Sequence, residues 1–110
     1  MENLELNPIE ISIVRNEIED QIRTCYDPEI PVNIYELGLI YEINVNSVGE
    51  VNIKMTLTSP SCPAAQILPN EVKIKSEKVP RVKSVSVEIV WEPRWDMSMM
   101  TEEARLTLGF

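Results

Sequence analysis

The residue best placed for chemistry in this sequence is Cys62, in the stretch Leu57–Pro63. That stretch is a proline-containing turn between an alternating run and a segment with helical spacing, and Ser59 or Ser61 is a candidate N-cap for the helix. A sulfur beside the free N–H groups of a helix N-terminus is favoured as the thiolate, which attacks electrophiles and binds metals. The alternative is that Cys62 is simply buried, as free cysteines often are.

A second loop carries polar side chains that could act with this cysteine. Two prolines restrict the loop that holds Asp27, Glu29 and Asn33, so these side chains should have reproducible orientations. Carboxylates can bind metal ions or change the pKa of a nearby thiol. The alternative is that Asp27 and Asn33 hydrogen-bond the backbone of their own loop.

The sequence has no histidine and only two cysteines, Cys25 and Cys62. Without histidine, Cys–His and Ser–His catalytic pairs and imidazole metal ligands are excluded. Two thiolates complete neither a structural zinc site nor a four-cysteine iron–sulfur cluster within one subunit. We therefore expect no tightly bound metal.

Composition indicates a globular protein with a single domain over residues 1–110. The hydrophobic content is 44% and the formal net charge is −8. This charge repels phosphate backbones and anionic lipids, so we expect no nucleic acid and no membrane among the partners. No apolar run is long enough to span a bilayer, and the first residues lack the features of a signal peptide, so we expect a cytoplasmic protein.

Hydrophobic spacing predicts the elements that position these loops. Spacings of three and four predict an amphipathic helix after Asn7 and Pro8, a cap followed by a proline at the first helical position. Its apolar residues are Ile11, Val14, Ile18, Ile22 and Cys25. We therefore expect Cys25 to lie in the core.

Alternation of apolar and polar residues predicts three strands. They cover 41–45, 51–57 and 85–91. The first two should form an antiparallel hairpin. A helix over 60–78 precedes the third strand, which should therefore return parallel to the second. Pro69 should kink or split that helix because proline lacks a backbone donor.

The C-terminal region holds two tryptophans, Trp91 and Trp95, on either side of Pro93. They are a candidate partner surface, and the alternative is that they are packing residues. Ser98 or Thr101 should cap a last short helix. The predicted fold is an α/β (α+β) two-layer sandwich in the order helix–strand–strand–helix–strand–short helix, with a three-stranded mixed sheet.

Three blocks of this sequence resemble the small iron–sulfur cluster assembly proteins of the SufT and PaaD type. The blocks are residues 26–34 with 37–41, residues 56–63, and residues 91–95 with 100–105. The resemblance implies the fold of that class and places the reactive cysteine at Cys62, with Asp27 and Glu29 as further cluster or metal-binding candidates. It also implies that Asn33, Thr58 and Ser59 line the same pocket. PaaD-type members carry an additional cysteine-rich C-terminal segment that is absent here, which favours the SufT-like branch.

The leading hypothesis is an accessory factor, not an enzyme, that delivers iron–sulfur clusters to client apoproteins. Cys62 would give one labile thiolate ligand to iron or to a transient cluster, and an iron–sulfur scaffold and the clients would be its partners. A cluster bridged across a homodimer is a further option.

Two alternatives stay open. One is a thiol enzyme with Cys62 as nucleophile and Asp27 or Glu29 as base, although carboxylates titrate too low to deprotonate a thiol well. The other is an adaptor without chemistry that binds an assembly scaffold and its clients through Trp91 and Trp95, including a PaaD-like role in oxygenase maturation.

Overall fold

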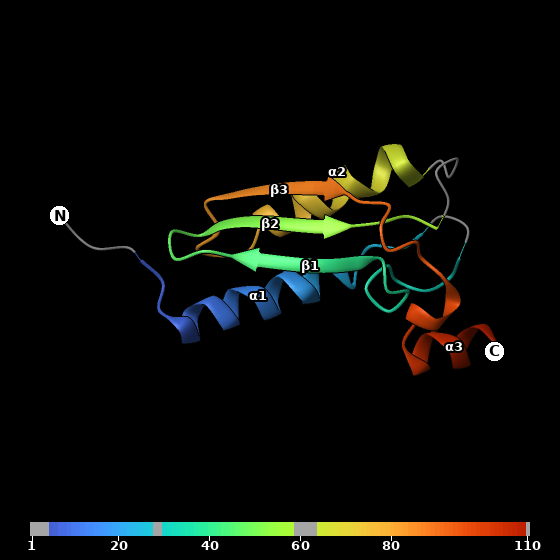
Figure 1. The fold of residues 1–110 in the computed structure, drawn as a ribbon. Helices are drawn as coiled ribbons and strands as arrows, with labels where there is room; N and C mark the ends of the chain where they lie inside the picture. Colours follow the sequence, from blue (N-terminus) through green and yellow to red (C-terminus); the bar gives the residue numbers. More distant parts are fainter. Residues whose placement is uncertain (1–4, 28–29, 59–63, 110) are drawn as a thin grey trace.

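The computed structural model describes residues 5–27, 30–58 and 64–109 (Figure 1). Its elements are α1 (Pro8–Ile22), β1 (Ile40–Val45), β2 (Glu50–Met55), α2 (Ala64–Glu77), β3 (Ser84–Ile89), the short 3-10 helix η1 (Met97–Met99) and α3 (Glu102–Leu108). The strands form one sheet in the order β1-β2-β3, with β1 antiparallel and β3 parallel to β2. The predicted element order and mixed sheet are confirmed.

Helix α1 begins where the sequence indicates, at a capping box. The Glu10 backbone N–H donates to Asn7 Oδ1 at 2.8 Å, and the Asn7 backbone N–H donates to Glu10 Oε1 at 3.0 Å. Pro8 occupies the first turn, where its missing N–H would have had no helical acceptor. Local sequence therefore determines where this helix starts.

Both long helices cover one face of the sheet. Helix α1 packs against β1 and α2, and α2 packs against β3. Along β2, Val51, Ile53 and Met55 are buried while Asn52 and Lys54 between them are not, so alternate side chains point into the helix layer. Within the part of the chain that the structure describes, no helix covers most of the opposite face of the sheet (Figure 1).

Cys25 lies in the turn that follows α1, and its exposed fraction is 0%. The prediction that it is a core residue is confirmed. Burial, followed by the negative charge of Glu71, raises the pKa of the Cys25 thiol to about 11, although Lys75 opposes this shift. Cys25 is therefore a neutral thiol at physiological pH.

Helix α2 runs without a break through Pro69, so the predicted split of this helix is wrong. Proline there removes a single backbone hydrogen bond, and the apolar contacts of the buried Leu68 and Val72 hold the helix on both sides of it. The predicted start of this helix at residue 60 falls outside the described residues.

Two strands end earlier than the alternating pattern predicts. Strand β2 ends at Met55, where the Thr56 N–H already donates to the Leu39 carbonyl oxygen at 2.8 Å. Strand β3 ends at Ile89, and Val90 N–H makes a last bond to the Met55 carbonyl oxygen at 2.8 Å. The alternation of residue types continues past both ends, but burial no longer follows it, because Thr56 and Leu57 are both buried and Trp91 is exposed.

Hydrogen bonds hold the segment after β3 against the start of β1 and the loop before it. Tyr41 Oη donates to the Pro93 carbonyl oxygen at 2.6 Å and also contacts Met99 Sδ at 3.4 Å. Trp95 Nε1 donates to the Leu37 carbonyl oxygen at 2.8 Å, and the Thr101 N–H donates to the Glu36 carbonyl oxygen at 2.9 Å. Thr101 also caps α3 by accepting from the Ala104 N–H at 3.1 Å, so one of the two predicted caps is confirmed.

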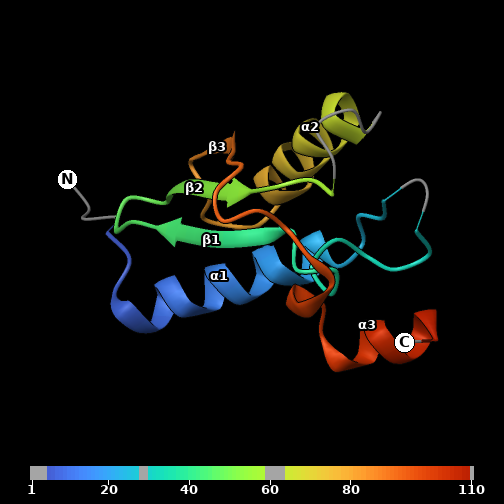
Figure 2. The same ribbon diagram turned by 45° about the vertical axis from the view of Figure 1, so that its right-hand side comes forward.

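The loops gather at one end of the molecule. The end of α1, the start of β1, the ends of β2 and β3, and α3 all lie at that end, while the β1–β2 turn and the start of α1 lie at the other (Figures 1 and 2). Among the described residues no helix combines the length and apolar character needed to cross a membrane.

Replacing Gly38 with alanine should destabilise the fold strongly. Gly38 has a φ of +81°, and a Cβ there would lie 2.3 Å from the Met99 carbonyl oxygen, so the substitution adds a backbone clash to the left-handed strain. We expect Gly38→Ala to lower the free energy of unfolding by roughly 3 kcal/mol in urea denaturation. Gly109→Ala is the matched control. Gly109 also has a positive φ, +84°, but a Cβ there would meet no described atom within 4 Å. This substitution should therefore lower the free energy of unfolding by only about 1 kcal/mol. Equal losses in the two variants would contradict the close contact.

Cys25 should make stability depend on alkaline pH. Its pKa is higher in the folded chain than in the unfolded one, so its contribution is complete below about pH 9 and is lost as pH rises through about 11. Between those limits wild type should lose roughly 2–3 kcal/mol more unfolding free energy than Cys25→Ala, measured by urea denaturation at each pH. Groups shared by both proteins cancel in the difference, and parallel stability curves would refute the buried thiol as the cause.

Candidate functional site

Three of the predicted site residues, Glu29, Ser59 and Cys62, lie outside the described residues. The placement of Cys62 at a helix entrance therefore stays a prediction. Of the described residues that adjoin them, Asp27 follows the Tyr26–Asn33 bridge and Thr58 lines a cavity at the ends of β2 and β3.

Asp27 occupies the base of the loop after α1. An isolated antiparallel bridge joins Tyr26 to Asn33, and the Ile34 N–H donates to the Cys25 carbonyl oxygen at 2.9 Å, so the two ends of this loop are tied together. Asp27 follows the bridge directly and is 4% exposed. Its carboxylate therefore faces the protein interior and not bulk solvent.

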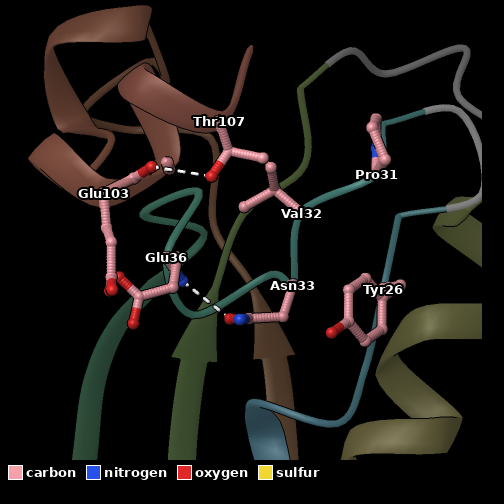
Figure 3. A pocket seen from close by; sticks show the side chains of 8 residues that line it. Tyr26, Pro31, Val32, Asn33, Glu36, Glu103 and Thr107 are labelled. Carbon is pink, nitrogen blue, oxygen red and sulfur yellow. Dashed lines mark hydrogen bonds between the residues drawn. The ribbon is translucent and has the colours of Figure 1, made fainter.

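Asn33 turns towards its own loop. Its Oδ1 accepts a hydrogen bond from the Glu36 N–H at 2.9 Å, which is the backbone contact that its residue type favours in turns (Figure 3). The alternative interpretation, a hydrogen bond within its own loop, therefore holds for Asn33.

Asn33 also lines a cavity of about 280 Å³ between this loop and α3 (Figure 3). The lining residues are Tyr26, Pro31, Val32, Asn33, Glu36, Glu103, Ala104 and Thr107. Most of them carry no sequence signal, because the cavity forms only when α3 packs beside a loop about 70 residues earlier in the chain.

An ion pair with Arg23, the residue that caps the C-terminus of α1, orients the carboxylate of Glu36 in this cavity. Arg23 Nε lies 3.5 Å from Glu36 Oε1, and the Arg23 guanidinium lies over the Tyr35 ring at 4.3 Å. Tyr35 Oη donates to Glu19 at 3.0 Å, and burial together with this bond raises the pKa of Tyr35. Glu36 is thus already paired with a cation.

A second cavity, of about 220 Å³, lies where β2 and β3 end. We call it the tryptophan pocket, and its lining residues are Thr56, Leu57, Thr58, Trp91, Glu92, Arg94 and Trp95. It brings the predicted pocket residue Thr58 together with both tryptophans of the predicted partner surface. Asn33 and Thr58 thus line different cavities.

The two tryptophans differ in their surroundings. Trp95 is partly buried and its indole nitrogen is anchored on the Leu37 carbonyl, so packing accounts for it. Trp91 is 43% exposed. Packing therefore accounts for Trp95, while part of the Trp91 indole stays on the surface and its role in a partner surface stays a prediction.

The described residues contain no group of three or more acidic or cysteine side chains arranged to hold a metal ion. Cys25 is not a suitable metal ligand either, because its thiol is buried and neutral.

The chain is similar to known proteins over most of its length. A model of the family described as iron–sulfur cluster assembly protein matches residues 15–89. An Fe-S protein maturation auxiliary factor of Porphyromonas gingivalis is 51% identical over 94 residues, which is 86% of this chain and 90% of that protein. The Fe-S protein maturation auxiliary factor SufT of Staphylococcus aureus is 39% identical over 83 residues, covering 76% and 94% of the two chains.

A solved structure agrees with this result. The crystal structure of a domain of unknown function from Bacillus anthracis superposes with a TM-score of 0.83 at 32% identity, covering 94% of this chain and 99% of that one. The three sequence blocks, the fold and these matches lead to the same conclusion: the chain belongs to the iron–sulfur cluster assembly protein family, in the SufT-like group.

Proposed function

We propose that this protein is an accessory factor in iron–sulfur cluster assembly, in which Cys62 gives a transient cluster or iron ion one labile thiolate ligand. The observation that carries the proposal is the 51% identity with an Fe-S protein maturation auxiliary factor across most of both chains. Its partners would be an assembly scaffold and client apoproteins, and it would act in the cytoplasm.

The described core supports Cys62 as the working thiol by eliminating the other cysteine. Cys25 is 0% exposed and its pKa is raised to about 11, so it is neither accessible nor ionised at neutral pH. A thiolate is the form that binds iron. One thiolate alone holds a cluster weakly, which suits a carrier that must release it, and two copies of the chain could share a bridging cluster.

The two loop carboxylates, Asp27 and Glu29, would have different roles. Asp27 is 4% exposed, so a cluster arriving from solvent cannot reach its oxygens without moving the loop. We assign Asp27 the role of shaping the loop and its local field, and Glu29 the role of candidate oxygen ligand. Carboxylate oxygen is an acceptable ligand for iron beside a single sulfur.

The test compares the two cysteines in cells. In a strain that lacks this protein, Cys62→Ser should leave the activities of several iron–sulfur enzymes at the level of the deletion, because serine keeps the shape but removes the soft sulfur ligand. Cys25→Ala is the matched control and should restore them when its protein level equals that of wild type. Full restoration by Cys62→Ser would remove the thiol from the mechanism and leave the adaptor function.

Anaerobic reconstitution with ferrous iron and sulfide gives the matching experiment in vitro. Wild type and Cys25→Ala should bind iron and sulfide, seen by absorbance and by mass under native conditions, and Cys62→Ser should bind at least tenfold less. The same mass measurement distinguishes a monomer from a cluster-bridged dimer. Equal iron and sulfide in all three proteins would exclude Cys62 as a ligand.

A further inference from the structure

We infer that β3 is the contact surface between two copies of this chain, which join their sheets edge to edge across a two-fold axis. The inference stands on the direction of the β3 backbone groups, on the regular register of β3 and on the charges beside it, and it does not rest on the proposed function. The two three-stranded sheets would become one continuous sheet, with the long helices of both copies on the same face.

The backbone groups of β3 point alternately at β2 and at the edge of the sheet. In the described part of the chain β3 is an outer strand (Figure 1). The Val90 N–H donates to the Met55 carbonyl oxygen at 2.8 Å, so position 90 faces β2. Because these groups alternate along a strand, Val85, Val87 and Ile89 direct their N–H and C=O groups to the outer edge. A second strand can therefore pair there without disturbing the bonds to β2.

Strand β3 suits such pairing better than β1, the other outer strand. The register of β1 shifts between Ile40 and Glu42, an irregularity of the kind that protects sheet edges. Strand β3 pairs with β2 without a shift from Ser84 to Ile89, contains no proline, and has Glu88 as its one charged residue. A regular edge of this kind is a template for another strand.

The sequence of β3 is complementary to itself when the second strand runs antiparallel. With Val87 on the axis, Val87 lies opposite Val87 of the second copy and Val85 lies opposite Ile89, so all three outward-facing residues pair. The side chains of these residues are buried or partly buried in the helix layer, which the second copy would extend. On the other face of the sheet Glu88 lies opposite Ser86, so no like charges meet.

The side of α2 next to this edge also fits a second copy. Lys75 Nζ donates to the Thr24 carbonyl oxygen at 3.0 Å, so that side of α2 faces α1. Lys73 and Glu77 lie on the opposite side of the helix, towards the outer edge of β3, and form an ion pair at 3.0 Å. A second copy would present the same cation and anion there, so its flank is complementary in charge. This favours a second copy over a lone extended peptide, which has no such flank.

The antiparallel arrangement determines where the two copies carry their cargo. In each copy β2 and β3 finish at the same end, because Met55 pairs with Ile89. Across the two-fold axis these ends point in opposite directions, so the two chains that continue towards Cys62 leave the joined sheet at opposite ends. This dimer therefore keeps the two Cys62 segments apart and differs from a dimer that a cluster bridges.

Sedimentation equilibrium of the reduced, iron-free full chain tests the inference. Wild type and Cys62→Ser should both be dimeric at about 1 mM and should have equal dissociation constants, because no cluster takes part. Val87→Pro should abolish the dimer, since proline removes an N–H that faces the second copy and leaves the bonds to β2 intact. Val87→Ile keeps that N–H and is the matched control. It should dimerise like wild type, and circular dichroism should show that both variants are folded.

Charge variants test the register. Ser86→Glu places two like-charge pairs with Glu88 across the axis and should raise the dissociation constant about fivefold, whereas Ser86→Lys should lower it by a similar factor. Asn44→Glu and Asn44→Lys make the same charge changes on the same face of β1, in register with Asn52 and Ser86, and should have less than about a twofold effect. Combining Ser86→Glu with Glu88→Lys should restore dimerisation.

Three results would overturn the inference. They are a dimer that forms only with iron, equal effects of the charge changes at positions 44 and 86, and a wild-type monomer at about 1 mM. A monomer would leave the edge of β3 to an extended segment of a partner protein. Because the measurement uses no iron and no client, its failure leaves the proposed role of Cys62 untouched.

Discussion

The parallel pairing of β2 with β3 is the constraint that shapes the end of the molecule where these two strands finish. This end carries the proposed site, and we call it the functional end. In this register Met55 lies opposite Ile89, so both strands finish at the same edge of the sheet. A parallel neighbour requires a crossover, which α2 provides on the helix face. The chain that leaves β2 towards Cys62 and the chain that leaves β3 towards Trp91 therefore start side by side, although they lie about 30 residues apart in sequence.

Covering the open face of the sheet is the second requirement. Two helices bury only one face, and the other is polar along most of β2, with Asn52 and Lys54 partly in contact with water. Only at the functional end does the segment after β3 fold over it, held by hydrogen bonds from Tyr41, Trp95 and Thr101. The glycine at position 38 allows the backbone of this segment to approach closely, because its missing Cβ leaves room for the Met99 carbonyl.

The sequence predicts most of the scaffold because local rules determine it. The cap at Asn7 with Pro8 after it, the apolar stripe of α1 and the alternation of β2 all act within a few residues of each other. Such local rules do not predict which residues come together at the site, because those residues are far apart in the sequence. The alternating pattern predicts that Thr56 is an exposed position of a half-buried strand. Thr56 is buried only because a segment about 35 residues later in the chain covers it. Family resemblance assigns Asn33 to one pocket with Thr58. In the structure Asn33 accepts a hydrogen bond from the Glu36 N–H and lines the cavity beside α3, whereas Thr58 lines the cavity at the ends of β2 and β3.

A carrier has two tasks, to hold its cargo and to recognise its partner. Separating these tasks explains why one fold would hold both a cargo-binding thiolate and a partner surface. A cargo bound through a single thiolate must be held weakly, so recognition of the partner has to come from another surface. A partner surface that includes the exposed Trp91 can supply that recognition without strengthening the binding of the cargo. Affinity for the partner and affinity for the cluster can then change independently, because the partner surface uses apolar contacts and the cargo uses sulfur.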